Sequence, residues 1–232
     1  MKKKILCTIC ARKNSKGLKN KNLKKISNKP LFTITLEHAL KSKLFDNIVV
    51  SSDSKIIKNI CKKKGVYFIE REKKLSGSYI SKISVIKDAL KRTEKIYKQK
   101  YDVIVDLDVT SPLRKILDIK KAINLFNKSR YHNLVSGSNS RKNPFFNQVI
   151  KSKNRVSLVK NMKKNIVSRQ LAPKVFDLNA SIYIWKRYAL INNKKLINKK
   201  TGLFQMEEER SIDIDNKLDF KIVKYIYENK LN

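Results

Sequence analysis

Short apolar runs of strand length alternate with helical patterns over residues 5–128 of this 232-residue chain, and no other feature limits its fold as strongly. The apolar runs, rich in Ile and Val, lie at 5–11, 47–51, 66–69 and 102–107. Helical spacing of apolar residues is found between them, at 30–45, 53–64, 80–98 and 116–128. This alternation predicts a doubly wound, mostly parallel α/β sheet. Ligands of such sheets bind beyond the carboxyl ends of the strands.

The second half of the chain departs from this rhythm. Residues 140–180 contain Pro144-Phe145-Phe146, two short strand-like runs and a polar loop, which predict an excursion from the sheet. A strand over 181–185 and a closing helix over 219–227 follow. We therefore expect one domain over 1–232 with an inserted arm at about 140–180. No apolar stretch approaches the length of a membrane span, so we expect no membrane partner.

Charge and cysteine content narrow the class of protein. The chain has 55 basic and 19 acidic residues, a net charge of +36 that would suit a polyanionic partner. The basic residues are spread over the whole length without interleaved aromatic platforms, so a basic nucleic-acid-binding protein is kept only as an alternative.

The cysteines indicate the compartment. There are only three, Cys7, Cys10 and Cys61, which is too few for a disulfide framework and indicates the reducing cytoplasm. Cys7 and Cys10 should point to opposite faces of one strand.

The loop after the first strand, residues 11–22, carries five cationic side chains. Arg and Lys there could surround a triphosphate with charge-assisted hydrogen bonds. The loop matches neither a Walker A motif nor G-x-G-x-x-G. A merely solvated basic loop remains the alternative interpretation.

Two acidic stretches are further candidates for chemistry. Asp106 and Asp108 share one face at the end of the central strand, where sites in such folds lie. Near the carboxyl end, strand alternation over 211–215 would place Asp213 and Asp215 on one face and two isoleucines on the other. Paired carboxylates suit Mg²⁺. In the alternative interpretation, Asp215 only caps the final helix.

Taken together, these stretches resemble one family. The chain resembles the CMP-sialic acid synthetases (acylneuraminate cytidylyltransferases), in which three of its motifs recur in the same order. The motifs are A-R-x-x-S-K-G-x-x-x-K-N at the amino end, T-S-P-L-R after the central strand and R-S-I-D-I-D near the carboxyl end. The similarity covers nearly the whole chain. The opening, Ile-Leu-Cys-Thr-Ile-Cys-Ala-Arg at 5–12, is most similar to the branch that acts on legionaminic acid.

The resemblance implies a cytoplasmic nucleotidyltransferase with a nucleotide-diphospho-sugar transferase-like fold, working as a homodimer. Such an enzyme joins CTP to a nonulosonic acid and releases pyrophosphate, for surface glycan synthesis, and its cofactor is Mg²⁺. The alternatives are a Kdo-like or pseudaminic acid as the substrate, or a catalytically inactive relative.

The resemblance also implies residue roles. The residues expected to bind CTP are Arg12, Ser15, Lys16, Lys21, Asn22, Arg71 and Ser81. Asp213 and Asp215 would bind the metal, and with Arg12 and Lys16 they would be catalytic. The residues expected to face the sugar acid are Asp108, Asn143, Phe145, Phe146, Asn147, Arg169 and Gln170, of which those on the arm would reach the neighbouring subunit's site.

Several positions depart from the family pattern or suggest a structural role only. Lys13-Asn14 stands where the family has two glycines, and Lys would resist a left-handed backbone there. Asp108 stands where many relatives carry Gln, and it would repel a sugar carboxylate unless a metal or an Arg offset it. The loop over 72–79 lacks the usual Pro and Asp. We expect His38 and His132 to be structural, and Tyr183 and Trp185 to pack in the core.

Overall fold

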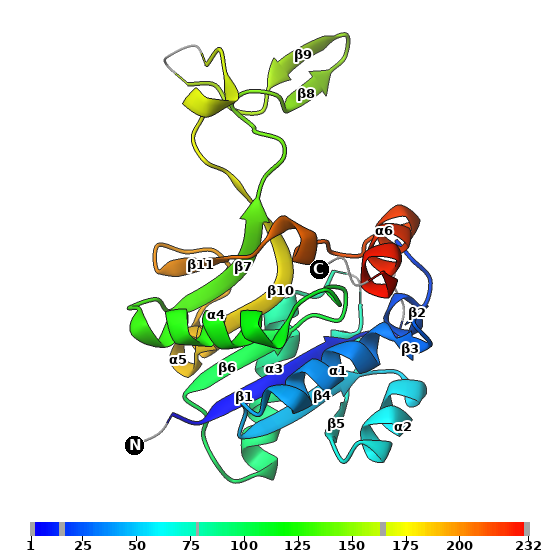
Figure 1. Cartoon of the computed structure of the whole chain (residues 1–232). Helices are drawn as coiled ribbons and strands as arrows, with labels where there is room; N and C mark the ends of the chain where they lie inside the picture. The colour runs from blue at the N-terminus through cyan, green and yellow to red at the C-terminus, as the bar shows by residue number, and fades with distance from the viewer. Residues whose placement is uncertain (1–2, 14–16, 78, 163–165, 230–232) are drawn as a thin grey trace.

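The computed structural model describes residues 3–13, 17–77, 79–162 and 166–229. Their centre is a seven-stranded sheet in the order β11-β7-β10-β6-β1-β4-β5 (Figure 1). Strand β10 is antiparallel to both of its neighbours, and every other neighbouring pair is parallel, which confirms the mostly parallel sheet. The strands are β1 (Ile5–Ala11), β4 (Asn47–Ser52), β5 (Tyr67–Glu70), β6 (Val103–Leu107), β7 (Asn133–Asn139), β10 (Phe176–Lys186) and β11 (Thr201–Gln205).

Helices cover both faces of the sheet. One buried apolar cluster joins the sheet to α1, α2, α4 and α6, and the other joins it to α3 and α5. Cys7 belongs to the first cluster and Cys10 packs against the second, so the two thiols do lie on opposite faces. The helices are α1 (Leu31–Ser42), α2 (Lys55–Lys63), α3 (Lys82–Ile96), α4 (Ile116–Lys128), α5 (Arg187–Asn192) and α6 (Lys217–Glu228).

Local signals set several element boundaries. The Ser54 hydroxyl accepts a hydrogen bond from the Ile57 amide at the start of α2, and Gly65 ends that helix with φ of 65°. At the start of α6 the cap is Asn216, whose side chain accepts bonds from the next two helical amides. The interpretation of Asp215 as the helix cap is therefore wrong, and its carboxylate is left for other contacts.

Other elements were not predicted. Strand β11, with five residues, and helix α5, with six, are too short to stand out in the sequence. The small strands β2 (Lys25–Ile26) and β3 (Lys29–Pro30) form a separate hairpin. Single 3₁₀ turns occur at Lys21–Leu23, Lys73–Leu75, Arg169–Leu171 and Glu208–Arg210.

An arm between β7 and β10 extends away from the sheet and ends in a hairpin of β8 (Val149–Ser152) and β9 (Arg155–Leu158) (Figure 1). Its apolar side chains are largely uncovered: Val149 is 57% exposed, Ile150 53% and Val156 68%. An arm with so much exposed apolar surface has little core of its own. No helix within the described ranges has the length and apolar character needed to cross a membrane.

Candidate active site

A cavity of about 300 Å³ lies at the edge of the sheet where β1 and β6 end. Segments that are far apart in the chain line this cavity: the loop after β1, residues 71–85, the loop after β6 and the segment before α6. The polar residues that line it are Arg12, Lys21, Asn22, Arg71, Lys82, Asp108, Thr110, Asp213 and Asp215. Its position at the carboxyl ends of parallel strands is the one expected for a doubly wound sheet.

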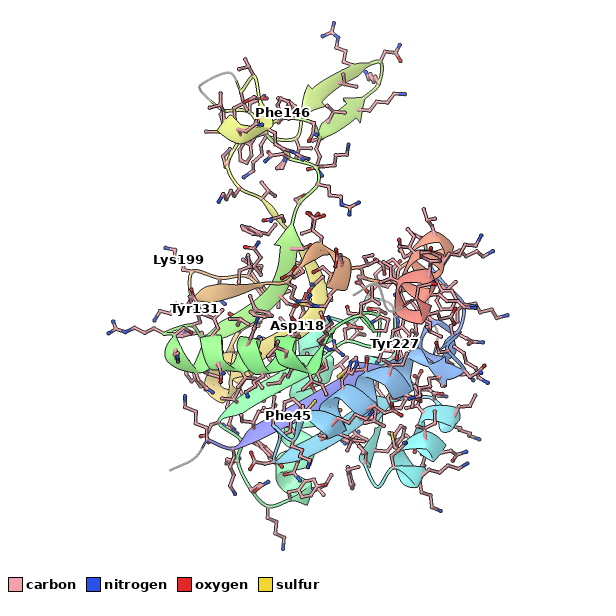
Figure 2. The ribbon with its side chains drawn as sticks, viewed as in Figure 1. Phe45, Asp118, Tyr131, Phe146, Lys199 and Tyr227 are labelled. Atoms are coloured by element: carbon pink, nitrogen blue, oxygen red, sulfur yellow. The ribbon has the colours of Figure 1, made fainter. Side chains whose placement is uncertain are left out.

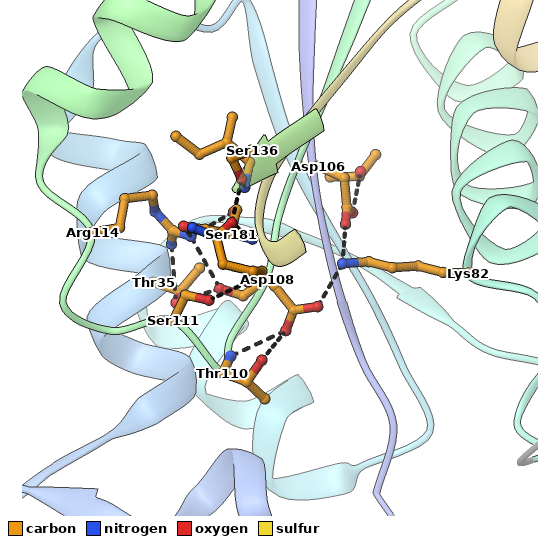
Figure 3. A network of polar contacts seen from close by, with 12 residues as sticks. Thr35, Lys82, Asp106, Asp108, Thr110, Ser111, Arg114, Ser136 and Ser181 are labelled. Carbon is orange, nitrogen blue, oxygen red and sulfur yellow. Dashed lines mark hydrogen bonds and ion pairs between the residues drawn. The ribbon is translucent and has the colours of Figure 1, made fainter. Parts of the chain in front are cut away.

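Lys82, the first residue of α3, forms ion pairs with two aspartates at the floor of this cavity (Figure 3). Its ammonium lies 2.9 Å from Asp106 Oδ2 and 2.5 Å from Asp108 Oδ2. Burial alone lowers the pKa of Lys82, but the two carboxylates outweigh it and raise the pKa above its usual value. Burial alone would raise the pKa of Asp108, because it disfavours the charged carboxylate. The charge of Lys82 and the hydrogen bonds from Lys82 and Thr110 outweigh burial and bring this pKa down to about 2. The cation beside Asp108 is therefore Lys82, which no sequence pattern had indicated.

Arg114, the last residue of T-S-P-L-R, holds the loop that carries Asp108. Its guanidinium is 1% exposed and donates to the Ser181 carbonyl at 2.7 Å and to the Asp108 carbonyl at 3.3 Å (Figure 3). A third bond goes to the Thr35 hydroxyl in α1. Arg114 thus ties α1, β10 and the loop after β6 together behind the cavity, and burial lowers its pKa to about 10. Arg114 therefore supports the site without facing it, whereas Thr110, the first residue of the motif, lines the cavity.

Residues 211–215 form an irregular segment and no strand, so the predicted strand there is wrong. The predicted alternation nevertheless holds: Ile214 is fully buried in the core, whereas Asp213 and Asp215 line the cavity. The Ile214 amide donates to the Thr110 carbonyl at 3.0 Å. Upstream, Arg210 anchors the segment by two 3.0 Å hydrogen bonds to a carboxylate in α4.

Asp213 and Asp215 are suited to a divalent cation. Asp213 Oδ1 is buried and has no hydrogen-bond partner among the described residues. Burial, followed by repulsion from Asp108 and Asp215, raises the pKa of Asp213 to about 6. The described residues contain no cluster of three or more His, Cys, Asp or Glu side chains that could hold a metal. Two carboxylates that line one cavity suit Mg²⁺, because this ion binds proteins through one or two carboxylates and completes its shell with substrate phosphates and water.

The other predicted nucleotide-binding residues surround this carboxylate pair. Lys21 forms a 3.1 Å ion pair with Asp215, and the Asn22 side chain donates to the Arg12 carbonyl at 2.9 Å. Arg71 lines the cavity while its guanidinium donates to Ser51 in β4. Ser15 and Lys16 lie outside the described residues.

The backbone at Lys13 answers one half of the concern about the missing glycines, and Asn14 lies outside the described residues. Lys13 is not among the described residues with positive φ, and its amide donates to Asp53 at 2.6 Å. Gly17 lies so close to the Asp215 carbonyl that a Cβ would collide with it. The loop therefore packs directly against the acidic segment, and Gly17 permits that approach.

Ser81 does not line this cavity; it is exposed at the start of α3 and borders a second cavity. The remaining predicted sugar residues lie on the arm, where Figure 2 labels Phe146. None of the described arm residues lines the cavity of its own chain. Asn143 and Asn147 are engaged in hydrogen bonds within the arm. The predicted sugar residues on the arm are Asn143, Phe145, Phe146, Asn147, Arg169 and Gln170.

Comparison with known proteins identifies the family of this chain. Residues 6–231 match the family model described as cytidylyltransferase. The chain belongs to the cytidylyltransferase family. It is 44% identical over 223 residues to the CMP-N,N'-diacetyllegionaminic acid synthase of Campylobacter jejuni, covering 96% of this chain and 94% of that protein. It is 43% identical over 227 residues to the post-translational flagellin modification protein B of Campylobacter coli, covering 97% and 96%.

The fold of this cytidylyltransferase also matches solved structures. A CMP:2-keto-3-deoxy-manno-octonic acid synthetase complexed with CTP aligns over 98% of this chain and 99% of its own, with a TM-score of 0.69 and 15% identity. At that identity the match supports the fold. The family resemblance and the fold class expected from sequence are confirmed, while no comparison tests the individual site residues.

Proposed function

We propose that this cytidylyltransferase joins CTP to a nonulosonic acid of the sialic or legionaminic type, giving a CMP-sugar and pyrophosphate for surface glycans. The observation that carries the proposal is the cavity at the strand ends, where Asp213 and Asp215 lie among Arg12, Lys21 and Arg71. A triphosphate needs this combination of cations and carboxylates. The 44% identity to a legionaminic acid synthase supports that sugar class.

In the proposed reaction the anomeric hydroxyl of the sugar attacks the α-phosphorus of CTP, and the bond to pyrophosphate breaks. Negative charge grows on the phosphoryl oxygens and on the departing pyrophosphate. Arg12 and Lys21 lie where they can stabilise that charge, and we keep Lys16 as a third cation from the family resemblance. Mg²⁺ held by Asp213 and Asp215 would add positive charge beside the triphosphate.

We also propose that the active unit is a homodimer, with residues 1–232 forming one domain whose arm at about 140–180 reaches the neighbouring subunit. The arm extends away from its own cavity, and Arg169 and Gln170 are exposed on it (Figure 1). The uncovered Val149, Ile150 and Val156 give the arm an apolar surface that a second copy of the chain can bury. The predicted sugar residues on the arm would then complete the partner's site.

Pyrophosphate release tests the reaction. CTP and Mg²⁺ are offered with N-acetylneuraminic, legionaminic, pseudaminic and Kdo acids in parallel. We expect release with at least one nonulosonic acid and a fall of about 10²–10³-fold in Asp215→Ala, because that variant loses charge stabilisation at the phosphates. Glu70→Ala is the matched control, since it removes a largely exposed carboxylate outside the cavity. Folded wild-type protein that releases pyrophosphate with none of these acids would contradict the proposal for them.

A further inference from the structure

A cavity of about 370 Å³, which we call the basal cavity, lies at the end of β6 opposite to the candidate active site. It is found where β1 and β6 begin and where β10 passes into α5. Figure 1 shows α5 and α6 on opposite sides of the molecule. The volume falls within the range of about 300–1,000 Å³ that is typical of small-molecule sites. The described residues that line the basal cavity and those that line the candidate active site have no member in common.

Backbone hydrogen bonds hold the walls of the basal cavity together. The Asp102 amide donates to the Lys4 carbonyl at 2.9 Å, and the Arg187 amide donates to the Asp102 carbonyl at 3.0 Å. The Asp102 carboxylate also accepts a bond from the Lys4 amide at 2.8 Å. The starts of β1, β6 and α5 are therefore tied to one another, and the cavity between them is preformed, as most small-molecule sites are.

The charged side chains around the basal cavity are mostly cations. Four cations line it, and Asp102 is the one carboxylate that does so among the described residues. Outside the lining, the Glu94 carboxylate pairs with Arg187 and Lys100. Four positive and two negative charges leave a net charge of +2, which favours an anionic group on a ligand. The four cations are Lys3, Lys100, Lys186 and Arg187.

Two of these cations remain available for such a group. Arg187 is engaged with Glu94 through two hydrogen bonds, of 2.7 and 2.9 Å. Lys3, in contrast, donates to the neutral side chain of Asn127 at 3.3 Å, and Lys186 forms no ion pair with any residue in the described ranges. An anionic oxygen in the cavity can therefore accept charge-assisted hydrogen bonds from Lys3 and Lys186 without breaking an existing ion pair.

The rest of the lining is largely apolar. Tyr101, Val103 and Phe126 contribute buried groups. Tyr188 is 47% exposed, and its ring packs edge-on against that of His132, with the ring centres 5.1 Å apart. This surface offers little to an inorganic anion, whereas an aromatic ring can bury its faces against it.

We propose that the basal cavity is a second ligand site, which binds a small anion whose charged group is attached to an aromatic ring. Lys3 and Lys186 bind the charged group, and Tyr188 and Phe126 contact the ring. The inference goes beyond the proposed function, because the reaction uses no residue of this cavity.

Binding of phenyl phosphate to isotope-labelled protein, followed by amide chemical shifts in the absence of CTP, tests the proposal. Inorganic phosphate carries the charge without the ring, and benzyl alcohol carries the ring without the charge. We expect phenyl phosphate to shift the amides of residues 100–103, 126–129 and 186–188. Its affinity should exceed that of either other probe by about tenfold or more, since the site uses both the charge and the ring.

Two variants show whether the lining residues bind the probe. Lys186→Glu and Tyr188→Ala should each weaken phenyl phosphate binding by about tenfold, because each removes one of the two kinds of contact. Lys199→Glu and Tyr225→Ala are the matched controls, since they make the same changes at exposed positions outside the cavity and should keep the wild-type affinity. A well-dispersed amide spectrum shows that each variant is folded.

Three results would overturn the site. The first is amide shifts that are spread over the basic surface or absent from the lining of the basal cavity. The second is an equal affinity for inorganic phosphate and phenyl phosphate, and the third is wild-type affinity in both Lys186→Glu and Tyr188→Ala. Because the titrations contain neither CTP nor a sugar acid, their outcome is independent of the proposed function.

Discussion

Replacing Lys82 by Met removes the cation shared by the buried Asp106 and the partly buried Asp108. The Asp106 side chain is fully buried; its Oδ1 accepts a bond from the Thr8 hydroxyl at 2.7 Å, and Lys82 lies 2.9 Å from its Oδ2. Breaking a buried ion pair leaves an uncompensated charge and costs about 3–5 kcal/mol. Because the Lys82 side chain keeps 28% exposure, water can reach the gap, and we expect the lower end, about 3 kcal/mol.

Urea unfolding followed by circular dichroism measures this loss. With a denaturant dependence of about 3 kcal/mol per molar urea, the midpoint of Lys82→Met should fall by about 1 M. Lys91→Met makes the same substitution at an exposed position of the same helix, and its change should stay within about 0.5 kcal/mol.

A double variant separates charge from packing. Adding Asp108→Asn to Lys82→Met removes one of the two stranded carboxylates, so it should recover about 1 kcal/mol or more of the loss. A midpoint for Lys82→Met equal to that of Lys91→Met would refute the reasoning, because the aspartates would then not depend on the lysine.

Two further predictions concern pH and subunit assembly. Burial, aided by Arg114 and Lys41, lowers the pKa of His38 to about 3, so the unfolded chain binds a proton there that the folded chain does not. The stability that neutral His38 contributes is complete above pH about 6.5 and is lost as the pH falls toward 3. At pH 5 the free energy of unfolding should be about 2 kcal/mol lower from this cause. Urea titrations at pH 8 and pH 5 measure the difference, and His38→Gln should abolish this part of it. The dimer is tested by mixing two inactive proteins, Arg169→Ala and Asp215→Ala, in equal amounts. Half of the dimers then contain one copy of each, and one of the two sites in such a dimer is intact. The mixture should therefore regain about a quarter of the wild-type activity. No regain, or a monomer by light scattering, would contradict the shared site.

Local patterns in the sequence determined most of the sheet and its helices. The continuous apolar runs of β1 and β6, and the helical spacing in α4, depend only on neighbours along the chain. The Ser54 cap and the left-handed Gly65 are local as well. For the same reason the pairing of Asp213 and Asp215 on one face could be read from spacing, even though the segment is not a strand.

Contacts between distant segments were decided only by the tertiary structure. Lys82 meets Asp106 and Asp108 because α3 begins over the carboxyl end of β6, and no spacing rule links those positions. Arg114 belongs to a motif shared with the family, and it is buried behind the cavity because β10 enters the sheet beside β6. The order of strands follows from burying both faces of the whole sheet at once, so the side chains that meet across it depend on every helix that covers it.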